Sequence, residues 1–287
     1  MTKITLPKKR GRPSAADLRA RRAAENARAA QSNRSDAQIL ADLKERFDIL
    51  SILSKGAVNR NVRAVSVTGG PGVGKTYTVE QILEVAHEEK GTQYEVVRGA
   101  ISAINLYKVA WRNRNAGNVI VLDDADGIFN DEDALNILKV LTDSSDRRVV
   151  SWLKESAALK EDDIPQSFEF EGSMIFISNL DWQKFVDQGK NKYAAHFEAL
   201  MSRSLYLDLR LHDKNELGVW VEHVATNGRM FQKEGLTLEQ AQAVSSFMKK
   251  HRDQLRELSL RTVLKLSQLV KTHRNWENMA RILLLKG

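Results

Sequence analysis

The chain has 287 residues, of which 42% are hydrophobic and 28% charged, an ordinary balance for a globular protein of one large or two modest domains. The absence of cysteine excludes disulfide bonds and thiolate metal sites. No apolar run approaches the roughly 20 residues of a membrane helix, and the first residues lack the apolar segment of a signal peptide. We therefore expect a cytoplasmic location and no membrane partner.

The net charge of +7 is concentrated in residues 1–34. This segment holds ten Lys or Arg against two acids, a net charge of +8, which leaves −1 for the other 253 residues. Its few apolar side chains cannot bury enough surface to order it. We therefore predict a disordered basic tail, with helix formation only on binding.

Within the tail, "KKRGRPS" at 8–14 resembles an AT-hook, a short extended segment that lies in the minor groove of A·T-rich DNA. Arginines are attracted to a narrow groove of negative potential, glycine permits a close approach, and proline stiffens the path. The resemblance implies DNA contacts by Lys8, Lys9, Arg10, Gly11, Arg12 and Pro13. A generic polycation that binds any phosphate backbone is an equally good interpretation.

From about Ser35 onward the pattern predicts a folded α/β part. Apolar residues return at helical spacing from that point, and a second helix is expected at 76–89. Short apolar strands are expected at 64–67, 94–97, 119–122, 174–178 and 205–209. Because strands alternate with helices, we predict a parallel sheet covered on both faces. Two more strand-like pieces, at 147–153 and 166–172, indicate an inserted hairpin.

After residue 212 the strand signal stops. Helical patterns follow at about 214–226, 237–254, 259–273 and 275–285. The predicted organisation is a tail at 1–34, an α/β domain at 35–212 and a small all-helical domain at 213–287.

The segment "VTGGPGVGKTYT" lies between the first predicted strand and the next helix, and it fits the P-loop pattern G-x-x-x-x-G-K-[ST] from Gly69 to Thr76. Glycines let backbone N–H groups close around phosphate oxygens, and the helix N-terminus adds its positive end. Lys75 would neutralise the β and γ phosphates of ATP, and the Thr76 hydroxyl would hold Mg²⁺. The predicted nucleotide contacts are Gly69, Gly70, Pro71, Gly72, Val73, Gly74, Lys75, Thr76 and Tyr77.

The strand "VIVL" runs directly into Asp123, 48 positions after Lys75. This spacing is typical of a Walker B acid, whose carboxylate orients the Mg²⁺ that bridges the phosphates. Asp123 could instead cap a helix, but the P-loop favours metal binding over capping. The metal residues we predict are therefore Thr76 and Asp123.

Beyond these two motifs, the chain resembles the AAA+ ATPases from about residue 36 to its end. "MIFISN" looks like the sensor 1 strand, which would place Asn179 near the attacking water. "HFEALMSRSLYLDL" looks like the helix end with the arginine finger, which implies that Arg203 reaches a neighbouring subunit's ATP. Arg210 is a nearby competitor that we expect to be solvated. "ELSLRT" resembles sensor 2, which implies that Arg261 reaches the nucleotide of its own subunit.

The resemblance implies that 35–212 binds nucleotide, that 213–287 is a lid, and that the chain forms a homo-oligomer, a hexamer or an open ring, with ATP between subunits. A compact core with a basic tail also resembles ATPases encoded by tailed bacteriophages, in which case the cytoplasm would be the host's. Asn179 could instead only cap a turn, and Arg203 could be a surface arginine without a partner.

The sequence departs from the family after Asp123. AAA+ proteins usually have Glu at the next position, where it polarises water, but here Asp124 is one methylene shorter. A displacement of about 1 Å can cost on the order of 100-fold in rate where geometry is tight. Asp124 can still accept a proton, so we predict competent but slow hydrolysis, with Asp126 as a distant second candidate base.

We therefore expect an ATPase that acts on DNA as a remodeller, loader or replication and packaging accessory. Arg147, Arg148 and Trp152 of the hairpin are further candidate DNA contacts, although packing is the better interpretation of Trp152. Basic residues of the C-terminal helices add modest support; they are Lys249, Lys250, Arg252, Arg256, Lys265, Lys271 and Arg274. Two alternatives remain open, a protein-remodelling machine and a nucleotide-gated switch that hydrolyses little. No aromatic–hydrophobic–Gly triplet lies near Gly99, which counts mildly against a protein threader.

Overall fold

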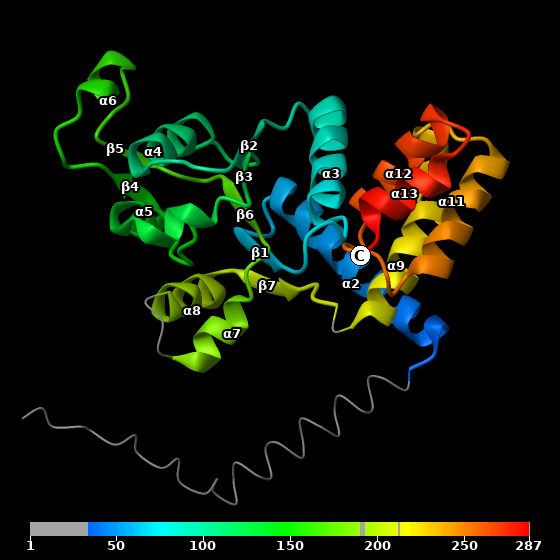
Figure 1. Ribbon diagram of the computed structural model, residues 1–287. Coiled ribbons are helices and arrows are strands. Elements are labelled where there is room, and N and C mark those ends of the chain that lie inside the picture. Colours follow the sequence, from blue (N-terminus) through cyan, green and yellow to red (C-terminus); the bar gives the residue numbers. More distant parts are fainter. Residues whose placement is uncertain (1–33, 190–192, 212, 287) are drawn as a thin grey trace, which may run out of the picture. The chain divides into compact units, whose positions relative to one another are not determined.

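The computed structural model describes residues 34–189, 193–211 and 213–286 (Figure 1). The AT-hook-like segment at 8–14 lies outside them. The chain divides into the units Met1–Ile39 and Leu40–Gly287, and the following description concerns the second unit. Within the described part, every helix is too short or too polar to span a bilayer.

Five parallel strands form the central sheet in the order β2-β3-β6-β1-β7 (Figure 1). They are β1 (Ala64–Thr68), β2 (Tyr94–Arg98), β3 (Val119–Asp123), β6 (Ser173–Ser178) and β7 (Leu205–Asp208). The three inner strands are buried along their whole length, which explains their continuous apolar runs. The predicted parallel sheet is therefore confirmed.

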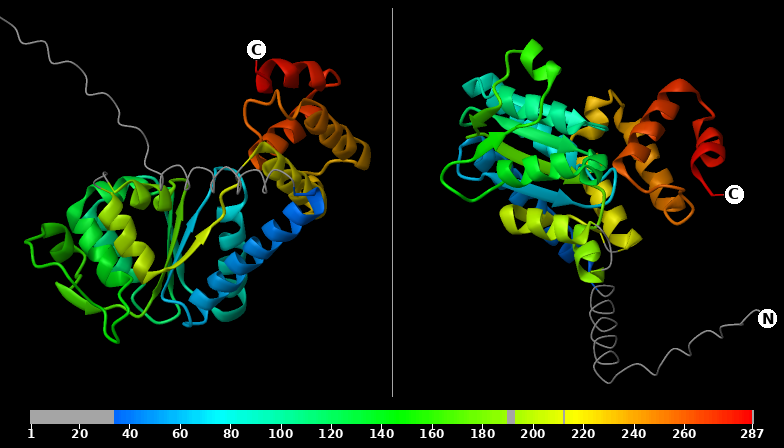
Figure 2. Two further views of the ribbon diagram at one scale, coloured as in Figure 1. Left: turned by 90° about the horizontal axis from the view of Figure 1, so that it is seen from below. Right: turned by 90° about the vertical axis from the view of Figure 1, so that its left-hand side faces the viewer.

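Helices cover both faces of the sheet (Figure 2). On one face lie α3 (Lys75–Lys90) and most of α2 (Asp36–Val58). The other face is covered by α4 (Ala103–Arg112), α5 (Glu132–Leu141), α7 (Trp182–Gln188) and α8 (Ala194–Arg203). The sequence patterns did not identify α4, α5 or α7, although α4 buries Leu106, Tyr107 and Ala110 at helical spacing.

The predicted inserted hairpin is confirmed as a separate antiparallel pair, β4 (Val149–Ser151) and β5 (Ser167–Glu169). Val150 and Phe168 face the core, while the residues beside them are exposed. A short helix, α6 (Ala157–Glu161), lies between the two strands in the chain.

From Lys214 to Leu284 the regular elements of the described chain are all helices, and we call this segment the helical part. They are α9 (Lys214–Asn227), α10 (Met230–Lys233), α11 (Leu238–His251), α12 (Leu260–Thr272) and α13 (Trp276–Leu284). Four of them match the predicted helices, and α10 is an additional single turn. Side chains such as Val244, Leu266 and Trp276 form a core of their own.

The sheet register brings the important chain segments to one edge. In the neighbouring parallel strands, Asp123 of β3 lies beside Ile177 of β6, and Ser178 lies beside Thr68 of β1. The P-loop, the acids after β3 and Asn179 therefore all leave the sheet at the carboxyl ends of adjacent strands, the usual place for a ligand in an open α/β sheet.

Candidate nucleotide-binding site

The P-loop connects β1 to α3 and requires glycine at two positions. Gly74 precedes the first residue of α3 at φ 108°, a conformation that L-residues with side chains rarely adopt. Gly72 has φ 69°, and a Cβ there would lie 2.8 Å from the Cβ of Ser259 in the helical part. The loop is thus shaped by its own backbone and by the close approach of the helical part.

Lys75 is almost fully buried, with 5% of its surface exposed. Its Nζ donates to the carbonyl oxygens of Gly69 and Gly70, both at 2.8 Å, and to Oδ1 of Asn179 at 2.9 Å. Burial lowers the pKa of Lys75 to about 8, although Asp124 and Asp123 act in the opposite direction. The ammonium is thus directed into the loop where phosphates would bind.

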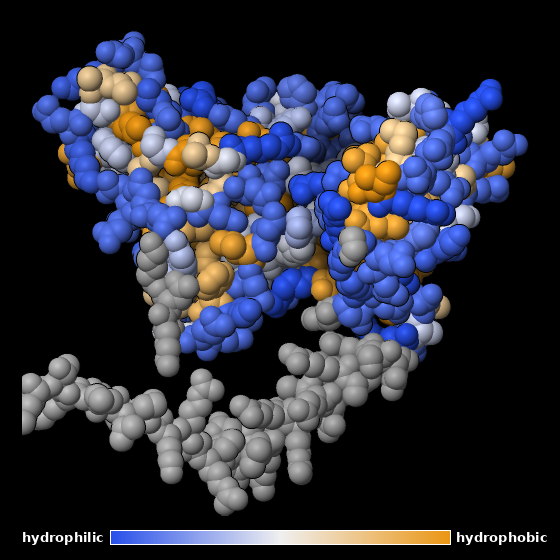
Figure 3. Space-filling view, in the orientation of Figure 1, coloured by the Kyte–Doolittle hydropathy of each residue, from blue (hydrophilic) through white to orange (hydrophobic). Residues whose placement is uncertain are grey.

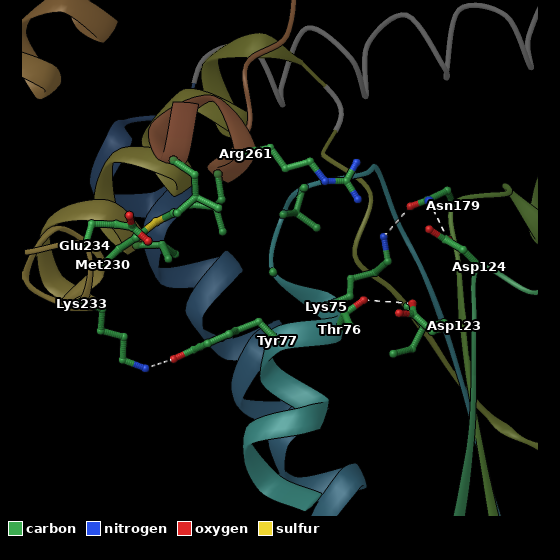
Figure 4. A pocket seen from close by; sticks show the side chains of 18 residues that line it. Lys75, Thr76, Tyr77, Asp123, Asp124, Asn179, Met230, Lys233, Glu234 and Arg261 are labelled. Carbon is green, nitrogen blue, oxygen red and sulfur yellow. Dashed lines mark hydrogen bonds between the residues drawn. The ribbon is translucent and has the colours of Figure 1, made fainter. Parts of the chain in front are cut away.

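Asn179 connects Lys75 to Asp124. Its Oδ1 accepts from Lys75, and its Nδ2 donates to Oδ1 of Asp124 at 2.6 Å (Figure 4). Only this orientation of the amide satisfies both partners, since the ammonium can only donate and the carboxylate can only accept. The residue predicted as sensor 1 therefore contacts both the P-loop lysine and the predicted water-activating acid.

Asp124 adopts a left-handed backbone conformation, with φ 52°. Its N–H donates to the carbonyl of Ile177 on β6, so the strand edge holds this turn in place. Aspartate tolerates such a conformation better than most residues with side chains. Asp126 behaves differently, because it accepts a hydrogen bond from Ser178 Oγ at 2.7 Å and its burial raises its pKa.

Asp123 is buried, and both of its oxygens have partners. Thr76 Oγ1 donates to Oδ1 at 3.0 Å, and Arg98 Nε donates to Oδ2 at 3.2 Å. A hydroxyl and a carboxylate are the hard oxygen ligands that Mg²⁺ prefers. The described residues contain no cluster of three or more His, Asp or Glu that could hold a metal by itself, so a Mg²⁺ at Thr76 and Asp123 would take its other ligands from phosphates and water.

The helical part is fastened to the P-loop backbone. The N–H of Leu260, at the start of α12, donates to the carbonyl of Gly72 at 2.9 Å. Trp220 Nε1, on α9, donates to the carbonyl of Val73 at 2.8 Å. The next residue of α12, Arg261, points across the pocket toward Lys75, and its positive charge helps to lower the pKa of Lys75 (Figure 4).

These segments enclose a cavity of about 320 Å³. At one end lie the P-loop and the acids, and at the other lie mainly apolar side chains of the helical part (Figure 4). Lys233 of α10 donates to the hydroxyl of Tyr77 at this second end and also lies 4.9 Å from the centre of its ring. The cavity therefore has a charged end suited to phosphates and an apolar end suited to a nucleobase.

No protein-family model matches this sequence. It is 38% identical over 239 residues to an uncharacterized 36.7 kDa protein from the nrdC–mobD intergenic region of Enterobacteria phage T4, which covers 83% of this chain and 73% of that protein. The chain belongs to the same family as that protein, in keeping with the expected similarity to phage-encoded proteins.

Among solved structures, the chain is similar to Drosophila ORC bound to DNA, with 14% identity, a TM-score of 0.42, and coverage of 82% of this chain and 64% of that one. It is also similar to NtrX from Brucella abortus, with 13% identity, a TM-score of 0.42, and coverage of 90% and 58%. The chain thus spans less than two thirds of either of these two proteins.

The predicted motifs meet at one place on the sheet. The P-loop follows β1, the acids follow β3 and Asn179 follows β6, all at one edge of a sheet ordered β2-β3-β6-β1-β7, and a helical part closes on the loop. This is the arrangement that the resemblance to the AAA+ ATPases led us to expect.

Arg203, the predicted arginine finger, lies away from the chain's own cavity. It ends α8, donates to the carbonyl of Ala199 at 2.9 Å, and places its Nε 3.9 Å from Oδ2 of Asp143. The expectation that Arg210 is solvated is wrong, because Asp208 and Asp181 both pair with its guanidinium.

Within the described part of the chain, most basic side chains proposed as DNA contacts have other partners. Arg148 is buried and donates to the carbonyls of Leu141 at 2.6 Å and Gly172 at 2.8 Å, so its prediction as a DNA contact is wrong. Arg147 pairs with Glu169, and Trp152 packs against the core. In the helical part, three lysines pair with glutamates: Lys249 with Glu222, Lys265 with Glu257, and Lys271 with Glu234.

Sequence reasoning missed two residues of the site, Arg98 and Lys233. Arg98 contacts Asp123 because the register of β2 and β3 places them side by side. Lys233 and Tyr77 meet although 156 positions separate them in the chain. A basic residue at the end of a strand was the only available signal for Arg98, and no pattern indicated the position of α10.

Proposed function

We propose that this protein is an AAA+ ATPase, which binds ATP with Mg²⁺ and hydrolyses it. The main support is that one cavity is lined by both the hydrogen-bonded series Lys75–Asn179–Asp124 and the Thr76–Asp123 pair. A Mg²⁺ held by Thr76 and Asp123 would neutralise phosphate charge. Lys75 and Arg261 would stabilise negative charge on the phosphate oxygens, and Asp124 would accept a proton from the water that Asn179 helps to orient.

Phosphate release by the purified protein tests this proposal. Lys75→Ala removes the ammonium directed into the loop, and Asp124→Asn removes the base while keeping a side chain of the same shape. We expect each change to lower the rate by about 100-fold or more, with nucleotide affinity lost only in Lys75→Ala. Equal rates in all three proteins would contradict the proposal.

A nucleotide-gated switch is a second candidate function. Asp124 is shorter than the usual glutamate, and one of its oxygens already accepts a hydrogen bond from Asn179. Both features restrict its reach toward a water molecule. Tight nucleotide binding with no phosphate release above that of Asp124→Asn would favour the switch.

We further propose that the protein works as a homo-oligomer with nucleotide between subunits. Arg203 lies outside its own chain's cavity, and its partly exposed side chain would approach the nucleotide of a neighbour after leaving Asp143. Exposed apolar side chains also gather over α13, where Ile282 is 67% and Leu283 54% exposed (Figure 3). Such a group is suited to burial against another subunit.

DNA is the macromolecular substrate that we propose. Support comes from the net charge of +8 on residues 1–34, which suits a phosphate backbone. We expect duplex or single-stranded DNA to stimulate ATP hydrolysis, and deletion of residues 1–34 to abolish this effect. Stimulation by an unfolded protein alone would favour protein remodelling instead.

A further inference from the structure

The carboxylate of Asp123 accepts one hydrogen bond from the P-loop helix and another from an arginine of the neighbouring strand. Thr76, on α3, bonds to Oδ1, while Arg98, the last residue of β2, bonds to Oδ2 at 3.2 Å. Arg98 and Asp123 are directly paired in the parallel register of β2 and β3. The sheet itself therefore fixes a guanidinium beside the acid that we assign to Mg²⁺.

Arg98 has a second anionic partner on the P-loop helix. Its guanidinium also pairs with Glu80, which lies on α3 five positions after Lys75. Side chains of one basic and two acidic residues thus form a continuous Glu80–Arg98–Asp123 chain. Only Asp123 of the three is buried, with 8% of its side chain exposed, whereas Arg98 is 55% and Glu80 34% exposed.

These contacts have opposite electrostatic effects on a cation at Thr76 and Asp123. The guanidinium repels a dication and competes for the charge of the carboxylate, and Glu80 offsets part of that repulsion. We propose that Arg98 acts through Asp123 as a positioning residue that weakens Mg²⁺ binding, and that Glu80 limits this effect. The inference rests on the proposed ATP–Mg²⁺ function and adds a determinant of its Mg²⁺ requirement.

The same strand provides a matched control. Arg112 of α4 pairs with Glu95 of β2 at 2.6 Å, with exposed side-chain fractions of 53% and 32%. This pair has nearly the same exposure and chemistry as Arg98 and Glu80, but it has no contact with Asp123. A general loss of a surface ion pair can therefore be separated from an effect on the metal site.

The experiment measures the Mg²⁺ concentration that gives half-maximal binding of a fluorescent ADP analogue. Relative to the unchanged protein, Arg98→Gln should need about tenfold less Mg²⁺, since one partly screened positive charge is removed. Glu80→Gln should need several-fold more, because Arg98 is then less neutralised. Arg98→Lys and the control Arg112→Gln should stay close to the unchanged protein, and the double variant Glu80→Gln/Arg98→Gln should behave like Arg98→Gln, because Glu80 then has no guanidinium to neutralise.

An unchanged or higher Mg²⁺ requirement in Arg98→Gln would overturn the inference, as would a double variant that needs several-fold more Mg²⁺ than Arg98→Gln alone. If the unchanged protein binds no nucleotide at any Mg²⁺ concentration, the proposed function itself fails. These results are distinguishable, because the first two require that the unchanged protein binds nucleotide in a Mg²⁺-dependent way.

Discussion

At the residue scale, the backbone conformation at position 124 suits the aspartate that stands there in place of the usual glutamate. Asp124 lies at φ 52°, where aspartate and asparagine are tolerated better than longer side chains. We expect Asp124→Glu to lower the free energy of unfolding by about 1 kcal/mol, and Asp124→Asn to leave it nearly unchanged. Urea unfolding of the three proteins measures this. Equal stability of the Glu and Asp forms would show that the turn places no constraint on the residue.

The lowered pKa of Lys75 predicts the direction in which stability and nucleotide affinity change with pH. Burial, the largest cause, lowers its pKa to about 8, so the amine is charged below that pH and neutral above it. Because the pKa in the unfolded chain is the ordinary 10.5, the unfolded chain binds more protons between these two values, and the unfavourable contribution of this buried amine to folding diminishes as pH rises through that window.

Nucleotide affinity should fall as pH rises above about 8, since a neutral amine attracts phosphates less. Lys75→Arg is the matched control, because a guanidinium stays protonated throughout. We expect it to bind ADP more weakly, but with the same affinity at about pH 7 and about pH 9. A parallel decline in both proteins would assign the pH dependence to another group.

At the element scale, α9 and α12 hold the P-loop by its carbonyl groups. Trp220→Phe should keep the stacking against Phe47, whose ring centre lies 4.2 Å away, but leave the Val73 carbonyl without its donor. The expected cost is about 1–3 kcal/mol of unfolding free energy, together with weaker nucleotide binding.

Trp152→Phe is a suitable comparison, since Trp152 Nε1 is buried and has no hydrogen-bond partner within the described part of the chain. It removes the same atoms without breaking a hydrogen bond. Chemical unfolding and ADP titration of both variants measure the difference. A similar loss in the two would mean that the bond to Val73 adds nothing.

The sequence was sufficient for elements whose residues carry a local pattern. The inner strands are continuous apolar runs, and the hairpin alternates, so both could be recognised. The helix α4 has a clear buried face at Leu106, Tyr107 and Ala110 and could have been found by the same periodicity.

The side-chain network of the site could not be predicted in the same way. Asn179 was expected near the γ-phosphate, but its bonds to Lys75 and Asp124 join positions 104 and 55 residues away. The Arg98–Asp123 contact depends on strand register, which no single motif specifies. Arg210 was expected to be solvated, but β7 and the start of α7 each supply an acid that pairs with its guanidinium.

At the scale of the whole molecule, the predicted site requires two subunits. The P-loop, Asp124 and Asn179 belong to one chain, and Arg203 would come from the next, as in a head-to-tail ring. Within the described part of its own chain, Arg203 contacts Asp143 and the Ala199 carbonyl and does not line the nucleotide cavity.

Mixing two inactive variants tests this central claim most directly. Lys75→Ala retains the arginine but cannot hold nucleotide, while Arg203→Ala holds nucleotide but offers no arginine to its neighbour. We expect each alone to release phosphate about 100-fold more slowly than the unchanged protein, and an equal mixture to recover at most about a quarter of the full rate, since about one interface in four then has both groups intact. A mixture that stays as inactive as its components would contradict a site shared between subunits.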